Sequence, residues 1–91
     1  MNYTFKENQL DYETYYILRK SVKWNNWSRE QAEIALGNSY YTVTVFDNKV
    51  PIGMGRAVGD GIYFMIMDIV VKPEYQRMGI GSTIIHMLLE H

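Results

Sequence analysis

Hydrophobic and polar positions follow a strand rhythm at the start of the chain and then a helical one. Residues 3–6 alternate with the period of a short strand. Across residues 11–22, apolar side chains recur at spacings of three and four, which predicts an amphipathic helix. Acidic residues stand early in this segment, and Arg19 and Lys20 stand late, as the helix dipole favours. We therefore expect the chain to open with a strand and a helix.

A second, shorter helix is expected between Ser28 and Gly37. Ser28 and Gln31 have the spacing of a capping box, and Gly37 is a common residue at the end of a helix. Trp24 and Trp27 fall between the two predicted helices. We favour their burial in the core over an aromatic wall that faces a substrate, because large aromatic side chains supply much of the apolar area that a small domain buries.

The next segment reads as a hairpin. Residues 40–46 are dense in aromatic and β-branched side chains, and a polar turn at residues 47–49 leads into a strand from Val50 onward. Gly53, Gly55 and Gly59 lie in this second strand. Glycine weakens a strand but permits a β-bulge or close packing, so we expect one or the other here.

A third strand and a last helix complete the pattern. Residues 62–71 are apolar on both faces apart from Tyr63 and Asp68, which predicts a strand in the interior of a sheet. From Ile80 onward, apolar side chains recur at helical spacing through Leu88. The predicted order is βααβββα, and strands joined by short turns form an antiparallel meander, so the fold class is α+β.

Composition narrows the range of functions. The chain has 91 residues, which fit a single domain. Its formal net charge is −1, and its lysines and arginines are spread along the sequence. The chain therefore has no cluster of basic residues that would bind a nucleic-acid backbone. No apolar run reaches the roughly 20 residues of a membrane helix. The chain lacks cysteine, and no residue cluster has metal-ligand spacing. We therefore expect a cytoplasmic protein without a metal, nucleic-acid or membrane partner.

The most informative segment joins the last predicted strand to the last helix. It reads Gln76-Arg77-Met78-Gly79-Ile80-Gly81-Ser82 and follows a strand end marked by a proline. The two glycines remove Cβ atoms where a ligand must come close to the backbone, and the first N–H groups of the helix are free to bind an anion. Phosphate oxygens suit such a site best.

Two common phosphate-binding patterns do not fit this segment. A P-loop requires a Gly-Lys pair, and the chain has none. A dinucleotide fingerprint requires a small residue three positions after Gly81, where Ile84 stands instead.

The segment instead resembles the pyrophosphate loop of the GNAT superfamily of N-acetyltransferases, whose pattern is Gln or Arg, two residues, Gly, one residue, then Gly or Ala. The preceding run of residues 69–73 and the glycine-rich run of residues 52–61 are also similar to that superfamily. The resemblance implies the GNAT-like acyl-CoA N-acyltransferase fold, with a mixed or antiparallel sheet flanked by helices. It covers only the front of that fold. We therefore expect one domain over residues 1–91, truncated after the coenzyme A-binding helix and without the C-terminal strands.

The resemblance implies that acetyl-CoA is bound at this segment. Backbone N–H groups around the turn would take the pyrophosphate, and the main chain at the end of the strand would pair with the pantetheine arm. The implied cofactor-binding residues are Ile69, Val70, Val71, Gln76, Arg77, Met78, Gly79, Ile80, Gly81 and Ser82.

Acetyl transfer in this superfamily is a direct attack of an amine on the thioester. Asp68 is the candidate for the base, or for the group that holds the substrate ammonium, because it is the single carboxylate of an apolar strand beside the motif. A hydrogen-bonded structural carboxylate is an equal alternative. Tyr63 is a second catalytic candidate, one of eight tyrosines. The superfamily usually protonates the leaving thiolate with a tyrosine from a later helix, which the predicted elements do not include.

Three functions remain open at this stage. The chain is an N-acetyltransferase acting on a small-molecule or peptide amine, a truncated domain that only binds coenzyme A, or a structural or interaction domain without chemistry. The strand of residues 62–71 has no predicted neighbour on its outer side, and open strand edges pair readily. A homodimer formed through this sheet edge is therefore a further expectation.

Overall fold

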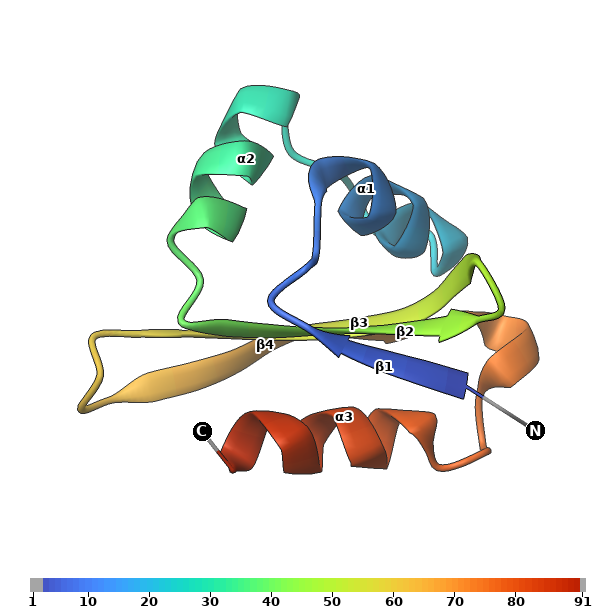
Figure 1. Cartoon of the computed structure of the whole chain (residues 1–91). Coiled ribbons are helices and arrows are strands. Elements are labelled where there is room, and N and C mark those ends of the chain that lie inside the picture. Colours follow the sequence, from blue (N-terminus) through green and yellow to red (C-terminus); the bar gives the residue numbers. More distant parts are fainter. Residues whose placement is uncertain (1–2, 91) are drawn as a thin grey trace.

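The computed structural model describes residues 3–90 and shows a four-stranded antiparallel sheet between two layers of helices (Figure 1). The strands lie in the order β1 (Tyr3–Glu7), β2 (Tyr41–Asp47), β3 (Val50–Gly59) and β4 (Phe64–Val71). The helices are α1 (Tyr12–Ser21), α2 (Arg29–Gly37) and α3 (Ile80–Leu89), with a single 3-10 turn, η1 (Pro73–Tyr75), after β4. The order βααβββα expected from the sequence is confirmed.

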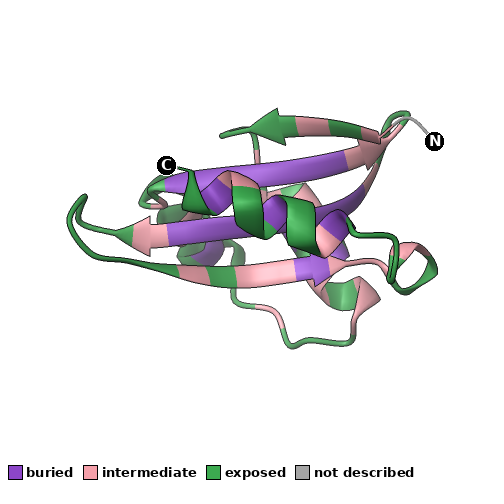
Figure 2. Cartoon of the chain, turned by 90° about the horizontal axis from the view of Figure 1, so that it is seen from below, coloured by how far each residue is buried: buried purple, intermediate pink, exposed green. Residues whose placement is uncertain are grey.

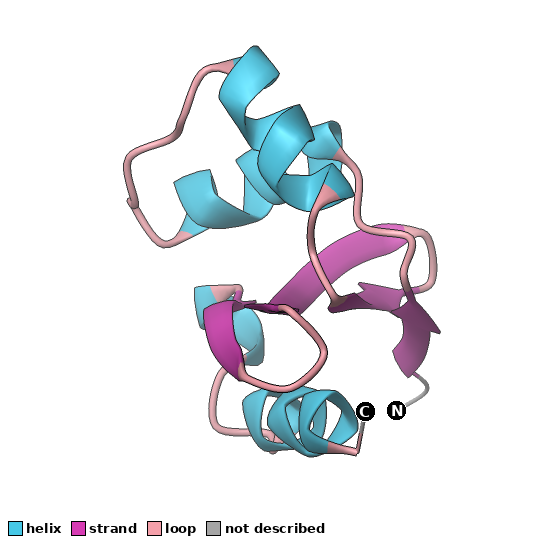
Figure 3. Cartoon of the chain, turned by 90° about the vertical axis from the view of Figure 1, so that its left-hand side faces the viewer, coloured by secondary structure: helices cyan, strands magenta, loops and turns pink. Residues whose placement is uncertain are grey.

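The helices divide between the two faces of the sheet. Viewed along the edge of the layers, α1 and α2 lie on one side and α3 lies on the other (Figure 3). Ser28 caps α2 as the sequence predicts, and Asp11 caps α1, a role that was not predicted. The Asp11 carboxylate accepts the N–H of Thr14 at 3.0 Å, and the Ser28 hydroxyl accepts the N–H of Gln31 at 3.2 Å. Each side chain thus satisfies one of the free N–H groups at a helix start.

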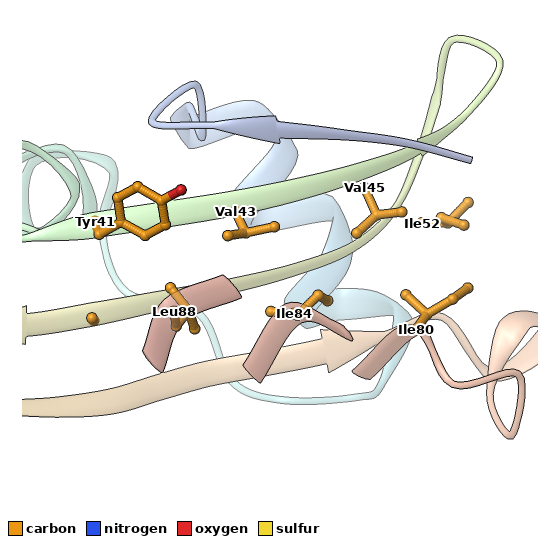
Figure 4. Packing of buried hydrophobic residues seen from close by; sticks show 8 residues of the cluster. Tyr41, Val43, Val45, Ile52, Ile80, Ile84 and Leu88 are labelled. Carbon is orange, nitrogen blue, oxygen red and sulfur yellow. The ribbon is translucent and has the colours of Figure 1, made fainter. Parts of the chain in front are cut away.

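Two apolar clusters hold the layers together. On the α3 side, Ile80, Ile84 and Leu88 point at the inner residues of β2 and at Ile52 (Figure 4). On the opposite face, α1 and α2 pack on β3 and β4 through Tyr15, Leu18, Ala32, Met54 and Val70. Seen from the α3 side, burial concentrates in β2 and β3, while β1 and most of β4 are more exposed (Figure 2).

The sheet contains two irregularities. Near the start of β3, Val45 pairs with Gly53 and Phe46 pairs with Pro51, so Ile52 is the extra residue. The second is on β4, where Asp68 and Ile69 together face Gly55. Asp68 has a left-handed conformation with φ of 55°, which shifts its side chain out of the regular alternation.

The glycines of β3 serve mainly close packing. A Cβ on Gly55 would lie 2.5 Å from Ile84 Cγ2 and 2.6 Å from Ile69 Cδ1. Only glycine therefore lets α3 and the bulged part of β4 approach β3 this closely at that position.

Two predictions for the last strand are wrong. Residues 62–71 were expected to be one strand, but β4 begins at Phe64. The Asp60 carboxylate accepts the N–H groups of Ile62 and Tyr63 at 2.9 Å each, which holds both residues in the turn. The apolar faces of β4 predicted the interior of a sheet, whereas within residues 3–90 the strand lies at the sheet edge, in agreement with the lack of a predicted neighbour on its outer side. The apolar composition of this strand therefore does not indicate whether it lies at the edge or in the interior of the sheet.

Candidate functional site

The turn between β4 and α3 forms an open hollow at the predicted phosphate-binding segment. The hollow has a volume of about 360 Å³. Its lining residues are Ile69, Val71, Tyr75, Gln76, Arg77, Gly79, Ile80, Gly81 and Ser82. All the predicted cofactor-binding residues except Val70 and Met78 line it. Sequence reasoning missed Tyr75, whose hydroxyl donates to Asp47 at 2.7 Å and ties the turn to β2. The position of Tyr75 directly before Gln76, the first residue of the motif, could have indicated that it lines the hollow.

The two glycines of the motif leave this hollow open. Gly79 is the N-cap of α3 and has φ of 81°, a conformation that side chains rarely adopt. A Cβ on Gly79 would meet nothing within 4 Å, and one on Gly81 would meet only Val71 Cγ2 at 3.7 Å. Because these positions face open space, a side chain there would not disturb the packing and would fill the approach to the helix start. The residues present therefore fit an anionic group.

The edge of β4 beside the hollow carries main-chain groups that face outward. The N–H of Lys72 donates to the carbonyl of Ile52 at 2.8 Å, so the neighbouring pair of Gly53 and Val71 is a non-hydrogen-bonded pair. The N–H and C=O of Val71 then point away from β3. By the same alternation, the main chain of Val70 faces β3, and its side chain is buried under α1.

Gln76 connects the turn to this strand edge. Its side-chain amide donates to the carbonyl of Val71 at 2.9 Å. This contact fixes the turn against the end of β4 and places Gln76 at the rim of the hollow. Met78 lies outside the lining, where the Tyr3 hydroxyl contacts its sulfur at 3.5 Å.

Asp68 lies at the centre of a charged cluster above the sheet. Its Oδ1 accepts from Arg19 Nη1 at 2.6 Å, and its Oδ2 accepts from Arg56 Nε at 2.7 Å and from the Tyr15 hydroxyl at 3.0 Å. The ion-paired side chains are only 8% to 12% exposed. The bulge in β4 turns Asp68 toward α1, and the cluster joins α1, β3 and β4.

The environment keeps the Tyr15 hydroxyl of this cluster in its donating form. Burial raises the pKa of the Tyr15 hydroxyl, and the adjacent Asp68 carboxylate raises it further. Tyr15 is therefore protonated at neutral pH and donates to Asp68. Both guanidinium groups also lie over its ring, with distances to the centroid of 5.6 Å for Arg19 and 5.9 Å for Arg56.

The two catalytic candidates from the sequence are not brought together. Asp68 stands at the bulge, and Tyr63 is 80% exposed in the turn beyond the other end of β4. Both oxygens of Asp68 are engaged by donors, so a substrate amine would have to exchange with one of them. Sequence reasoning considered Asp68 but missed its partners Arg19 and Arg56. An arginine inside the otherwise apolar strand β3 was the available signal.

A second hollow, of about 340 Å³, opens directly beside this cluster. Its lining residues are Arg19, Trp27, Gln31, Ala35, Arg56, Met67 and Asp68. We refer to it as the Asp68 hollow. It lies on the α1 and α2 side of the sheet, whereas the glycine turn belongs to the α3 side.

The expected burial of the two tryptophans is wrong. Trp24 is 43% exposed and Trp27 is 57% exposed. The loop that carries them is held away from the core by Arg19, whose Nε donates to the carbonyl of Asn25 at 3.2 Å and whose guanidinium lies 5.2 Å from the Trp24 ring centroid. Neither ring is part of the two apolar clusters of the core.

Known proteins share both the sequence and the fold of this chain. The sequence profile of the acetyltransferase (GNAT) family matches residues 3–91. The chain belongs to this family. A crystal structure of a probable acetyltransferase from methicillin-resistant Staphylococcus aureus is 36% identical with a TM-score of 0.90, and the match covers 98% of this chain and 68% of that chain. A GNAT family acetyltransferase from Streptococcus pneumoniae is 33% identical with a TM-score of 0.85, covering 98% and 67%.

This GNAT chain is shorter than its relatives. The uncharacterized N-acetyltransferase ycf52 of Pyropia yezoensis is 32% identical over 75 residues, which are 77% of this chain and 43% of that protein. The chain thus spans about two fifths of this curated relative. Within residues 3–90, no group of acidic, histidine or cysteine side chains is placed to hold a metal ion. No helix in that range is both long and apolar enough to cross a membrane.

Proposed function

We propose that this GNAT chain carries the cofactor-binding part of an N-acetyltransferase that moves an acetyl group from acetyl-CoA to a primary amine. The observation that carries the proposal is the open hollow at the glycine-capped start of α3, next to the outward-facing main chain of Val71. A helix start supplies free N–H groups for phosphate oxygens, and an open strand edge supplies main-chain partners for an extended amide chain.

The individual residues divide the binding between them. The backbone N–H groups of residues 78–82 would hold the pyrophosphate, with Arg77 at the rim as a cationic donor. The N–H and C=O of Val71 would pair with the pantetheine amides. The Gln76 side chain, which donates to the Val71 carbonyl, would either give up this hydrogen bond to the ligand or keep it beside the ligand. When bound, acetyl-CoA supplies a thioester carbonyl that an amine can attack.

The transfer itself needs no covalent bond to the protein. Acetyl-CoA would supply the acyl carbon for a neutral amine nitrogen and, as the carbon–sulfur bond breaks, a thiolate to take the proton that the nitrogen loses. The role we assign to Asp68 is to act on the amine before attack, either by accepting its proton or by holding it. The Arg19, Arg56 and Tyr15 donors fix the orientation of that carboxylate.

Two measurements distinguish this function from two further candidates, a domain that only binds coenzyme A and an interaction domain. A calorimetric titration with coenzyme A distinguishes an interaction domain, which would give no binding heat, from either cofactor-binding function. Release of free thiol from acetyl-CoA in the presence of an amine then distinguishes an enzyme from a domain that only binds. We expect binding by the 91-residue chain and turnover by a full-length protein. No coenzyme A binding by the folded chain would disprove the proposed function.

A further inference from the structure

We propose that the Asp68 hollow accepts a primary amine that also carries a carboxylate, as an aromatic amino acid does. The inference rests on the proposed function, because it names the acceptor of that reaction. It comes from the charge, hydrogen bonding and apolar surface of residues that line the hollow.

The charge of the hollow is unbalanced. Arg19 and Arg56 each contribute a guanidinium, and Asp68 contributes the single carboxylate that both of them contact. The other lining residues are neutral, so the lining carries one surplus positive charge. All three charged side chains are largely buried, so water screens the surplus charge only in part. A ligand carboxylate would balance it.

Arg56 is the residue with a free donor for this carboxylate. Arg19 uses Nη1 on Asp68 and uses Nε and Nη2 on the carbonyl of Asn25. Arg56 uses Nε on Asp68 and Nη1 on the Ser39 hydroxyl at 3.2 Å. Within residues 3–90, no hydrogen bond engages its Nη2, and this nitrogen is not among the buried atoms that lack a partner, so it is open to solvent and to a ligand. A carboxylate near this nitrogen would receive a charge-assisted hydrogen bond.

The apolar part of the lining indicates what else the acceptor carries. Trp27 and Met67 are exposed at 57% and 40%, and both border the hollow. A planar or apolar group of the ligand would cover them and gain from leaving water. A polyamine would bring additional positive charge to a lining that already has an excess. We therefore exclude polycationic amines from the expected acceptors.

The two tryptophans make binding measurable without any reaction. The chain has only Trp24 and Trp27, and Trp27 lines the hollow. We would titrate the protein with L-phenylalanine and with 2-phenylethylamine, which differ only in the carboxylate, and follow tryptophan emission excited where phenyl rings do not absorb. Since a hydrogen bond to a charged group contributes about 1.5–3 kcal/mol, phenylalanine should bind roughly tenfold more tightly or better.

A third ligand separates the carboxylate from the amine. 3-Phenylpropionate keeps the ring and the carboxylate but lacks nitrogen, and it should also bind more tightly than 2-phenylethylamine. O-Phosphoethanolamine tests whether a phosphate serves in place of the carboxylate, and we expect weaker binding because it has no ring to cover Trp27. Equal affinity for phenylalanine and 2-phenylethylamine, or a preference for the amine without carboxylate, would overturn the inference.

Two substitutions shift the charge balance in opposite directions. Asp68→Asn raises the surplus and should tighten 3-phenylpropionate binding several-fold, since this ligand has no ammonium for Asp68 to hold, whereas Arg56→Gln removes the surplus and should abolish the preference for phenylalanine over 2-phenylethylamine. A merely structural role would weaken binding in both variants. Arg29→Gln is the matched control, because Arg29 pairs with Glu13 and Glu33 on the exposed surface and does not line the hollow. It should change neither affinity.

Failure of this inference can be told apart from failure of the proposed function. The proposed coenzyme A site, at the glycine turn, shares no lining residue with the Asp68 hollow. A protein that binds coenzyme A but shows no preference for the carboxylate would overturn only the acceptor class. The wild-type ligand series decides the matter even if one of the variants does not fold.

Discussion

Asp68 shows how one residue acquires its role from backbone conformation. Its φ of 55° belongs to a region that asparagine and aspartate enter more readily than other side chains. The bulge at this residue directs the carboxylate to Tyr15 and to two arginines rather than into regular strand alternation. Replacement by asparagine preserves the conformational preference and the shape, and it removes the charge together with one of the two acceptor oxygens.

The first prediction concerns this charge in catalysis. In a full-length protein, Asp68→Asn should lower kcat at neutral pH more than it lowers acetyl-CoA affinity, because the carboxylate acts on the amine and does not touch the glycine turn. The measurement is steady-state kinetics with a separate titration of coenzyme A. Unchanged turnover in the asparagine variant would return Asp68 to a purely structural role.

The second prediction concerns the approach to the start of α3. Gly81→Val should abolish coenzyme A binding while the protein stays folded, since a Cβ there meets only Val71 Cγ2 at 3.7 Å and the rest of the side chain would enter the hollow. Calorimetry gives the affinity and circular dichroism gives the fold. His86→Val is the control, because it puts the same β-branched residue at an exposed site farther along α3. Undiminished affinity in a folded Gly81→Val protein would remove the assignment of the turn.

At the scale of elements, α3 depends on the absence of a side chain in β3. Gly55→Ala should destabilise the protein by about 1–3 kcal/mol, because the new methyl group would overlap Ile84, Ile69 and Leu88. Gly37→Ala is the matched control. Its Cβ would meet nothing within 4 Å at the end of α2, so it should stabilise by about 0.4–1 kcal/mol. Urea unfolding measures both changes. Equal effects of the two substitutions would contradict this account of α3 packing.

The start of α2 gives another prediction at this scale. Ser28→Ala removes the acceptor for the N–H of Gln31 and should cost about 1 kcal/mol, which lowers Tm by roughly 4–8 °C in a domain of this size. Thermal unfolding followed by circular dichroism measures the shift. Ser82→Ala, at an exposed position inside α3, is the control and should leave Tm nearly unchanged. A Tm that does not fall in Ser28→Ala would show that α2 does not depend on this cap.

For the molecule as a whole, the outer edge of β4 decides how the 91-residue chain behaves in solution. Within residues 3–90 no strand pairs with this edge, and Phe64, Met65 and Met67 on it are exposed by 40% or more. Solved relatives extend beyond the length matched here. Unpaired strand edges with apolar side chains favour association.

We therefore propose that the purified 91-residue chain forms dimers or larger species through β4 and transfers little acetyl by itself. Light scattering measures the mass, and thiol release measures transfer. Met65→Lys should shift the mass toward the monomer, because a charge on an edge strand disfavours pairing. Ile34→Lys, at a similarly exposed apolar site on α2, should not. A wild-type monomer that turns over acetyl-CoA with a simple amine would contradict the proposal.

The sequence predicted features that depend on neighbours within a few positions. Ser28 caps α2 as its spacing from Gln31 indicates, and Ile80, Ile84 and Leu88 form the buried face of α3. The glycine motif also indicated the family correctly. The sequence did not indicate that Trp24 and Trp27 are exposed, and the apolar faces of the last strand predicted a sheet interior although no outer neighbour was predicted for it. An apolar segment has the same composition whether or not another element covers it.

By itself, the sequence determined the order of the elements, the helix starts and the glycine turn, because each depends on short-range periodicity, capping or backbone freedom. Only the tertiary structure decided the surroundings of Asp68. Its partners Arg19 and Tyr15 lie 49 and 53 positions away, and Arg56 lies 12 positions away across a bulged strand pair. Such contacts require the packing of α1 on the sheet, since local residue patterns do not bring distant charges into contact.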